Sequence, residues 1–311
     1  MGFNKSINHM LENYDIDHLR QLEAESIKII REVAANFQNP VLLYSIGKDS
    51  STILKLAQKA FFPGKIPFPL MHIDTGYKFR EMIEFRDYYV NKIEAKLIVE
   101  KNMSPEALGL KPQEAHTDYY IYHKKTKPLL DAIKKYNFDA AIGGARREEE
   151  KSRAKERIFS VRDEMGVWDP KNQRPELWSV YNTSLNDGQT MRVFPLSNWT
   201  ETDIWAYIML EKIEVVPLYF AQKRKVVKRN GVLIRLDEFN QASDGEEVLE
   251  VVCRYRTLGC SPSTGAVVSN ATTVEEILQE VSVAKKSERE NRAIDYTSES
   301  SMENKKKEGY F

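Results

Sequence analysis

A turn near residue 47 contains residue types that bind phosphate groups. It reads Tyr-Ser-Ile-Gly-Lys-Asp-Ser-Ser over 44–51, between an apolar segment and an amphipathic one. Gly47 allows a sharp turn, and the backbone N–H groups of a helix that starts there attract anions. Serine hydroxyls and the mobile ammonium of Lys48 add donors. An ordinary capped helix after a glycine turn has the same composition, so the turn alone leaves both interpretations open.

The spacing within this turn excludes two common phosphate-binding loops. A Walker A loop has a glycine five residues before its Gly-Lys pair and a Ser or Thr directly after it. Leu42 and Asp49 occupy those two positions here. The turn also lacks the Gly-x-Gly-x-x-Gly pattern of dinucleotide-binding loops. The predicted anion site is therefore of another kind.

A second candidate anion site is the charged run Gly-Gly-Ala-Arg-Arg-Glu-Glu-Glu-Lys-Ser-Arg-Ala-Lys-Glu-Arg over 143–157. We predict a charge-rich helix from Glu148 onward. In this segment Arg147, Lys151 and Lys155 are spaced to share one helix face, and their mutual repulsion favours an anion bound among them. The alternative is a solvated helix with internal ion pairs, which most charge runs form.

His72 and Asp74 stand where another apolar segment, 70–74, meets Thr75-Gly76. The Asp74 carboxylate is suited to Mg²⁺ or to a nucleotide hydroxyl. A histidine at such a position is more often a structural residue than a catalytic one.

Short apolar strands alternate with helices through the first half of the chain. Strands are expected at 41–44, 70–74, 96–99 and 138–142, with helices at 17–37, after 51, at 79–89 and at 128–136. This alternation predicts an α/β fold with a Rossmann-like, doubly wound and mainly parallel sheet. Ligands bind beyond the carboxyl ends of such strands, where this chain carries Ser45–Gly47, Asp74–Gly76 and Gly143–Gly144.

The second half of the chain is less regular. A strand is expected at 191–194, and the capping-box pattern Thr200–Asp203 begins an apolar helix. Beyond that helix, short strand-like runs alternate with loops. We therefore predict a nucleotide-binding α/β domain over 1–212 and a less regular C-terminal extension over 213–311. The extension serves either to contact a partner or to cap the sheet.

Composition excludes several classes of protein. The 311 residues are 41% hydrophobic and 30% charged, as in a globular protein. Basic and acidic residues both number 46, so no global field favours nucleic acid or an anionic membrane. The sequence has no apolar run long enough for a membrane span, and its start does not resemble a signal peptide. Two cysteines, Cys253 and Cys260, make neither a disulfide framework nor a zinc site, which favours a cytoplasmic protein.

Several of these motifs resemble those of known families. Ser-Ile-Gly-Lys-Asp-Ser over 45–50 resembles the PP-loop of the ATP-pyrophosphatase superfamily, and the block 72–81 resembles the second motif of its sulfate-metabolism branch. Longer blocks resemble the small subunits of sulfate adenylyltransferases, which belong to the phosphoadenosine-phosphosulfate reductase branch: 143–157, 168–178, 192–201, 256–260 and 309–311.

This resemblance implies more than the residues alone. It implies an adenine nucleotide alpha-hydrolase-like fold and a heteromer with a larger GTPase subunit. In that family the small subunit converts ATP and sulfate to adenosine 5′-phosphosulfate and pyrophosphate, the first step of sulfate assimilation. Hydrolysis of GTP on the partner helps to drive the reaction.

The chemistry of that reaction suggests which side chains to expect. Sulfate is a dianion at neutral pH, so its attack on the α-phosphorus needs no general base. Arginines, lysines, backbone N–H groups and Mg²⁺ are expected instead. We assign catalysis to Lys48, Arg146, Arg147, Lys151 and Arg153. We assign binding of the nucleotide to Ser45, Ile46, Gly47, Asp49, Ser50, Ser51, His72, Asp74, Gly143, Gly144 and Ser152, with Asp74 also as the Mg²⁺ ligand.

Three other functions remain open at this point. A phosphosulfate reductase needs a reactive cysteine near the C-terminus, and none follows Cys260. A non-catalytic regulatory subunit would bind the nucleotide without turning it over. An RNA-thiolating PP-loop enzyme is disfavoured by the neutral net charge and by the lack of a further cysteine module.

Overall fold

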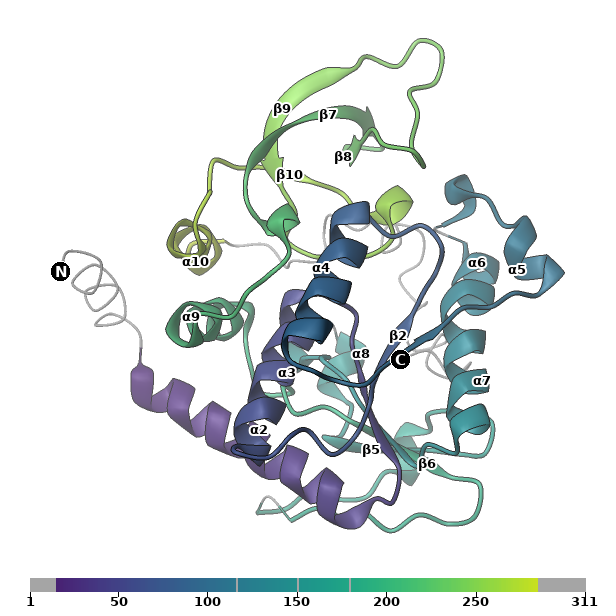
Figure 1. Ribbon diagram of the computed structural model, residues 1–311, viewed down its shortest axis with the longest axis vertical. Coiled ribbons are helices and arrows are strands. Elements are labelled where there is room, and N and C mark those ends of the chain that lie inside the picture. The colour runs from purple at the N-terminus through teal and green to yellow at the C-terminus, as the bar shows by residue number, and fades with distance from the viewer. Residues whose placement is uncertain (1–14, 116, 150, 179, 285–311) are drawn as a thin grey trace.

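The computed structural model describes residues 15–115, 117–149, 151–178 and 180–284, and its centre is a six-stranded sheet (Figure 1). The order of the strands is β3-β2-β1-β4-β6-β5. Their bounds are β1 Pro40–Leu43, β2 Leu70–Ile73, β3 Leu97–Glu100, β4 Ala140–Ile142, β5 Phe159–Arg162 and β6 Thr190–Val193.

The direction of the strands confirms the predicted fold class. β3, β2, β1, β4 and β6 run parallel to their neighbours, and the chain crosses over in both directions from β1, as in a doubly wound sheet. Only β5, at one edge, is antiparallel to its neighbour β6. This edge strand was not predicted, because it has only four residues, Phe-Ser-Val-Arg, and follows a charged run closely.

Alternate residues of the central strands face two separate layers of helices. Leu42 and Ile142 pack into the larger core, together with α2 (Ile16–Asn36) and α3 (Lys48–Phe61). Val41 and Ala141, one residue earlier in each strand, pack against α7 (Lys127–Tyr136) on the other face. Burial of both faces explains why these strands read as short, fully apolar runs.

The remaining elements of the first half connect these layers. They are α4 Arg80–Lys92, α5 Pro105–Gly109, the 3₁₀-helix η1 Pro112–Glu114, α6 Asp118–Ile121 and the π-helix η2 Tyr122–Thr126, which runs directly into α7.

The charged segment after β4 differs from its prediction. A continuous helix from Glu148 is wrong: the structure has a 3₁₀-helix, η3 (Arg147–Glu149), and a single helical turn, α8 (Lys151–Ala154). Arg147 and Lys155 lie outside α8, so the predicted row of like charges along one face does not form. The start of this segment is tied to a distant loop, because the Arg147 N–H donates to the Ser197 carbonyl, 3.0 Å away.

The chain then enters the C-terminal part through α9 (Glu201–Glu211), whose predicted capping box is present: the Thr200 hydroxyl and the Asp203 carboxylate each accept the other's backbone N–H. A second, antiparallel sheet follows, in the order β10-β9-β7-β8. Its strands are β7 Gln222–Arg229, β8 Val232–Arg235, β9 Leu249–Arg254 and β10 Val267–Val268. The remaining helices are η4 Pro170–Asn172, which precedes β6, and η5 Pro217–Tyr219, η6 Ser261–Ser263 and α10 Val274–Ser282, which follow α9.

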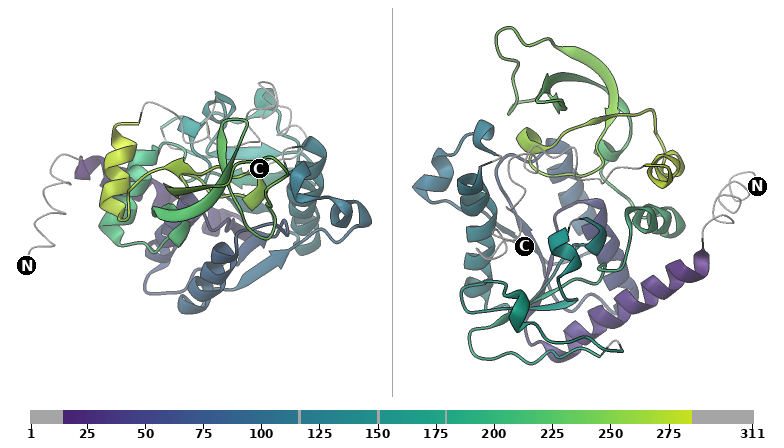
Figure 2. Two further views of the ribbon diagram at one scale, coloured as in Figure 1. Left: turned by 90° about the horizontal axis from the view of Figure 1, so that it is seen from above. Right: turned by 180° about the vertical axis from the view of Figure 1, so that it is seen from behind.

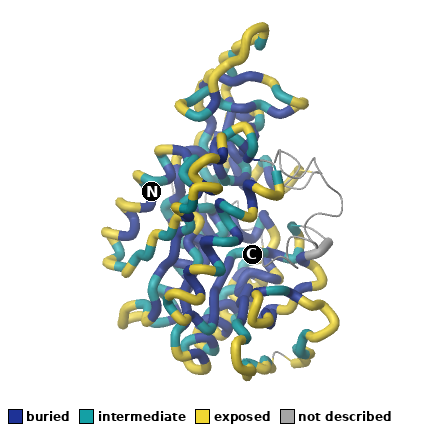
Figure 3. Tube along the Cα trace, turned by 90° about the vertical axis from the view of Figure 1, so that its right-hand side faces the viewer, coloured by how far each residue is buried: buried dark blue, intermediate teal, exposed yellow. Residues whose placement is uncertain are grey.

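This second sheet lies across the end of the main sheet, as the view from above shows (Figure 2). Its outer tip is largely exposed, whereas its base merges with the buried centre of the molecule (Figure 3). The rings of Trp205 and Tyr219 meet edge-on at 5.2 Å, and Phe79 lies 5.0 Å from Tyr255. Both contacts join the part before residue 212 to the part after it. No helix among the described residues is long and apolar enough to cross a membrane.

Candidate active site

The loop between β1 and α3 is held in a left-handed turn by Ile46 rather than by glycine. Ile46 has φ of 69° and its side chain is fully buried, whereas Gly47 has φ of −77° and serves as the N-cap of α3. The expectation that Gly47 makes the turn is therefore wrong. A β-branched residue is strained at positive φ, and here the surrounding core keeps it there.

The start of α3 is capped by a residue that is remote in the sequence. The Lys48 N–H donates to the hydroxyl of Tyr219 in η5, at 2.7 Å. The side chain of Lys48 is only 1% exposed, and its Nζ lies 3.0 Å from an oxygen of Asp49. The predicted mobile cation is thus already fixed beside a carboxylate.

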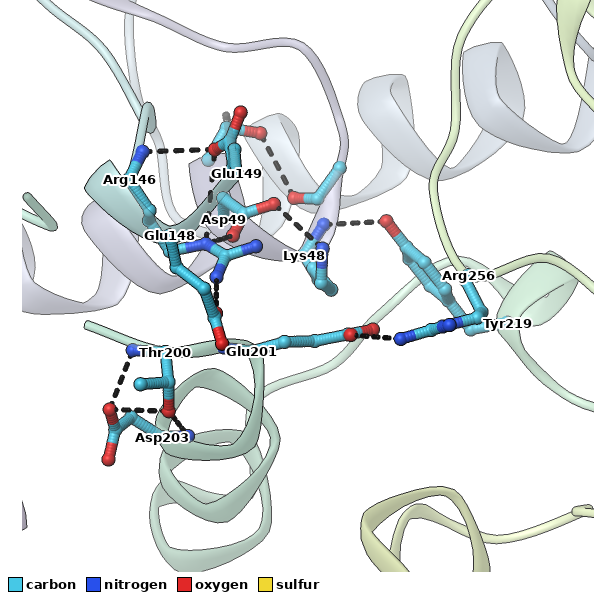
Figure 4. A network of polar contacts seen from close by, with 12 residues as sticks. Lys48, Asp49, Arg146, Glu148, Glu149, Thr200, Glu201, Asp203, Tyr219 and Arg256 are labelled. Carbon is cyan, nitrogen blue, oxygen red and sulfur yellow. Dashed lines mark hydrogen bonds and ion pairs between the residues drawn. The ribbon is translucent and has the colours of Figure 1, made fainter. Parts of the chain in front are cut away.

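A network of ion pairs and hydrogen bonds runs from this loop into the C-terminal part (Figure 4). Arg146 is buried; its Nε donates to Asp49 at 2.8 Å and its NH1 donates to Glu148 at 2.9 Å. The backbone N–H of Glu201 donates to the Glu148 carboxylate at 2.7 Å. The Arg256 guanidinium in turn donates to the Glu201 carboxylate at 2.5 Å. Three segments that are remote in sequence, around Arg146, Glu201 and Arg256, are thereby tied to the loop.

Beside this network lies a cavity of about 300 Å³ at the carboxyl ends of β1, β2 and β4. Its position is the one that the parallel sheet predicts. Seven of the predicted site residues line it: Ser45, Asp49, Ser50, His72, Gly143, Gly144 and Arg153. Gly144 is closely packed, because a Cβ there would lie 3.0 Å from the Cβ of Asp49.

The other predicted residues are near the cavity without lining it. Ile46, Gly47, Lys48 and Ser51 belong to the loop and to the first turn of α3, and Arg146 lies behind it in the charge network. Arg147 points elsewhere: its guanidinium donates to the side chain of Asn198. The side chains of Lys151 and Ser152 lie outside the described part of the structure.

His72 is buried and held by the neighbouring strand. Its Nδ1 lies 2.9 Å from the carbonyl oxygen of Tyr44, so Nδ1 carries the hydrogen in this contact. Burial, assisted by Lys78, lowers the pKa of His72 to about 4. The imidazole is therefore neutral near pH 7 and presents Nε2 as an acceptor, which has no hydrogen-bond partner among the described residues.

Asp74 has a local structural role. One carboxylate oxygen accepts the N–H of Gly76 at 2.8 Å, which closes the turn after β2. The described residues contain no group of three or more His, Cys, Asp or Glu side chains arranged for a metal. The carboxylates that line the cavity are those of Asp49 and Glu149.

Sequence reasoning missed one wall of the cavity. This wall comes from Thr75 and Lys78 after β2, Lys125 and Thr126 of η2, and the segment from Leu258 to Thr264. The last segment reaches the cavity because the Ser261 N–H donates to the carbonyl of Tyr77 at 2.8 Å. No local pattern in the sequence connects these three segments, so only their packing reveals them.

Comparisons with known proteins identify the family of this chain. Residues 39–266 match the phosphoadenosine phosphosulfate reductase domain, so the chain belongs to that α/β family. A sulfate adenylyltransferase subunit 2 of Saccharophagus degradans is 59% identical, covering 97% of this chain and all of that one. The subunit 2 of Phocaeicola vulgatus is 58% identical over the same shares. The reductase from Candida auris, solved with phosphate, is 18% identical and covers 66% of this chain and 91% of its own, with a TM-score of 0.45.

Within that class the chain belongs to the family of sulfate adenylyltransferase subunits 2. The family relationship inferred from the motifs, and with it the assignment to an enzyme family of nucleotidyltransferases, is confirmed.

Proposed function

We propose that this chain binds ATP and sulfate in the cavity beside the β1–α3 loop and forms adenosine 5′-phosphosulfate and pyrophosphate. The observation that carries the proposal is the coincidence of that cavity with the anion-binding loop, in a chain whose full-length relatives bear the name of this activity. A sulfate oxygen attacks the α-phosphorus, the bond from the α-phosphorus to the bridging oxygen breaks, and pyrophosphate leaves with the electron pair. No proton is transferred in this step.

The chain's own groups supply positioning and charge for this reaction. Ser45 and Ser50 line the cavity at the N-terminus of α3, where hydroxyls and helix N–H groups favour phosphate oxygens. Arg153 lines it as well and carries positive charge toward the reacting groups. The apolar side chains of Leu43, Met71 and Ile73 offer a surface for the adenine ring.

The cavity also suits a magnesium ion bound together with the nucleotide. Mg²⁺ is commonly held by one or two carboxylates plus substrate phosphates, and Asp49 and Glu149 both line this cavity. Bound there, the ion would neutralise charge on the departing pyrophosphate. The assignment of Asp74 to the metal remains a prediction, and Asp74 is not among the residues that line the cavity.

The name subunit 2 of the relatives implies a partner subunit. We propose that this partner is the large GTPase subunit, that its GTP hydrolysis drives the unfavourable step, and that the assembly works in the cytoplasm. The region 213–311 is the proposed contact surface. Within it, the described residues also build part of the active-site wall, so binding of a partner there has a direct route to the cavity.

Exchange of labelled pyrophosphate into ATP, measured with the GTPase subunit present, tests the function. Exchange that depends on sulfate supports catalysis by this chain. Exchange that is absent at all sulfate concentrations contradicts it and favours a regulatory subunit. Formation of sulfite from the phosphosulfate with a thiol donor would instead revive the reductase, although Cys253 and Cys260 are both buried.

The same assay tests the assignment of the arginines. Arg153→Met should reduce exchange because Arg153 lines the cavity. Arg147→Ala is the second test. If Arg147 is a catalytic residue, this variant should show reduced exchange and a nearly unchanged stability. Normal exchange by Arg147→Ala would show that Arg147 is not a catalytic residue. Its role would then be the hydrogen bond that its guanidinium donates to the Asn198 side chain.

A further inference from the structure

The turn after β2 brings two lysine side chains together outside the cavity. Gly76 has φ of 82°, a left-handed conformation that glycine adopts without strain. The point where a Cβ of Gly76 would stand lies 3.4 Å from Nζ of Lys101 and 3.9 Å from Nζ of Lys124. Lys101 directly follows β3 and Lys124 belongs to η2, so the two ammonium groups reach this turn from different elements. None of these three residues lines the cavity.

Neither of these ammonium groups has a counter-ion. Within the described ranges, Nζ of Lys101 and Nζ of Lys124 form no hydrogen bond and no ion pair. A neighbouring lysine shows the usual arrangement, because Lys127 lies 2.7 Å from the carboxylate of Asp131. Two positive charges thus meet at the turn without a matching carboxylate.

Burial and charge repulsion both act on Lys124. Burial lowers the pKa of its ammonium, and the charge of Lys101 lowers that pKa further. Asp74 opposes these effects, but it forms no ion pair with Lys124, and one of its oxygens already accepts the N–H of Gly76 at 2.8 Å. An anion bound between the two lysines would offset both costs.

The ammonium of Lys124 is fixed in place and yet open to solvent. Lys124 is only 4% exposed, and its Nζ lies over the ring of Tyr77 at 5.1 Å. Tyr77 is itself held, since its hydroxyl donates to the carbonyl of Leu110 at 2.6 Å and its ring stacks on Tyr120. Nζ of Lys124 makes no hydrogen bond but is not among the buried polar atoms of the described residues that lack one, so solvent reaches it. A ligand therefore meets an ammonium whose side chain is already ordered.

We propose that Lys101 and Lys124, which meet at Gly76, form a binding site for a compact inorganic oxyanion of charge −2, sulfate or phosphate. Lysine ammonium groups act as compact point charges and suit such anions. The site goes beyond the proposed function, because it lies outside the cavity and takes no part in the proposed reaction. The adjacent residues Thr75 and Lys78 do line the cavity, so the turn connects the two sites.

Limited acetylation of lysines in the full chain, followed by peptide mapping, tests the site directly. Acetylation of Lys101 should slow by about tenfold when sulfate or phosphate is present at about ten times its Kd, because a single site is then about 90% filled. Sodium chloride at the same ionic strength only screens charge and should give no such protection. Lys134, an exposed lysine of α7, is the internal control and should react at one rate in all solutions. The anion that protects at the lower concentration is the ligand of the site.

Three variants locate the bound anion. Lys124→Met removes the charge but keeps an apolar stem against Tyr77, and it should abolish the protection of Lys101. Lys124→Arg keeps the charge and should retain part of the protection, and Lys134→Met is the matched control that should retain all of it. Protection should also persist in Arg153→Met, because Arg153 lines the cavity and not this turn.

Several results would overturn the proposal. They are no protection of Lys101 by either oxyanion, equal protection by chloride, protection that Lys134 shares, and protection that survives in Lys124→Met. Loss of protection in Arg153→Met would place the anion in the cavity instead. If Lys124→Met does not fold, the wild type and Arg153→Met still decide the matter. None of these measurements depends on pyrophosphate exchange, so the site and the proposed function can fail independently.

Discussion

The backbone N–H of Lys48 donates to the hydroxyl of Tyr219 across 171 positions of sequence, at 2.7 Å. The first N–H groups of a helix have no partner within it, and this one is supplied by a side chain from η5. The β1–α3 loop is therefore not a self-contained motif, because a residue from the second half of the chain completes its helix cap.

Tyr219→Phe should destabilise the fold and weaken ATP binding together. It removes only the acceptor of a buried N–H group, which costs about 1–3 kcal/mol. Urea unfolding and the KM for ATP measure the two effects. The control is Tyr119→Phe, at an exposed position, for which both quantities should stay at wild-type values. Loss of stability with unchanged ATP binding would show that the cap does not shape the loop.

Gly144→Ala should disturb the start of α3 from the neighbouring strand end. The added Cβ would meet the Cβ of Asp49 at 3.0 Å, and the backbone around Ser50 at 3.4 Å leaves little room for adjustment. We expect a loss of about 1–3 kcal/mol and a higher KM for ATP. Gly109→Ala, where a Cβ meets nothing within 4 Å, is the matched control. Equal behaviour of the two variants would contradict the packing argument.

His72 should make stability depend on pH in the acidic range. Its folded pKa of about 4 lies below the ordinary value of 6.5, so the unfolded chain binds more protons between those values. Stability is then fully present above about pH 6.5 and falls as the pH drops toward 4, by about 3 kcal/mol in total. Urea unfolding at several pH values should show this slope in the wild type.

His72→Gln is the variant for that experiment, because its amide can still donate to the carbonyl of Tyr44. The difference in slope between the wild type and the variant isolates the histidine from the carboxylates that titrate in the same range. An identical slope in both would show that His72 does not titrate as its burial requires.

Arg256→Met should destabilise the protein strongly by leaving Glu201 without its cation. The side chains of Arg256 and Glu201 are 12% and 7% exposed, and removing one partner of such a pair costs about 3–5 kcal/mol. Lys223→Met removes a cation from an exposed pair with Glu250 and should cost only about 0–1 kcal/mol. Urea unfolding compares the two; a similar small loss in both would mean that water replaces Arg256.

Local sequence predicted the main sheet well because each strand is short, apolar and buried on both faces. Val41, Leu42 and Ala141 illustrate this, since alternate residues meet different helical layers and no polar residue interrupts the run. β5 was missed because it has only four residues, two of them polar, and follows a charged run, although all four are buried. The capping box at Thr200 was predictable because both of its partners lie within one turn of helix.

The candidate site was predicted only where it depends on adjacent residues. Ser45 and Ser50 follow β1 directly, and Gly143 and Gly144 follow β4, so the rule for parallel sheets places them together. The helix predicted from Glu148 does not form as one element, and η3 and the single turn α8 take its place. Tyr219 and Lys125 were missed because their neighbours in space lie far away in sequence.

The wall formed by Leu258 to Thr264 also has a consequence for biosynthesis. A ribosome releases the chain from its N-terminal end, so the β1–α3 loop emerges long before the residues that enclose the cavity. Until Leu258 to Thr264 emerge, the nascent chain lacks this wall and cannot form the complete candidate site. Competence to bind its substrates thus arrives late in translation, when more than four-fifths of the 311 residues have been synthesised.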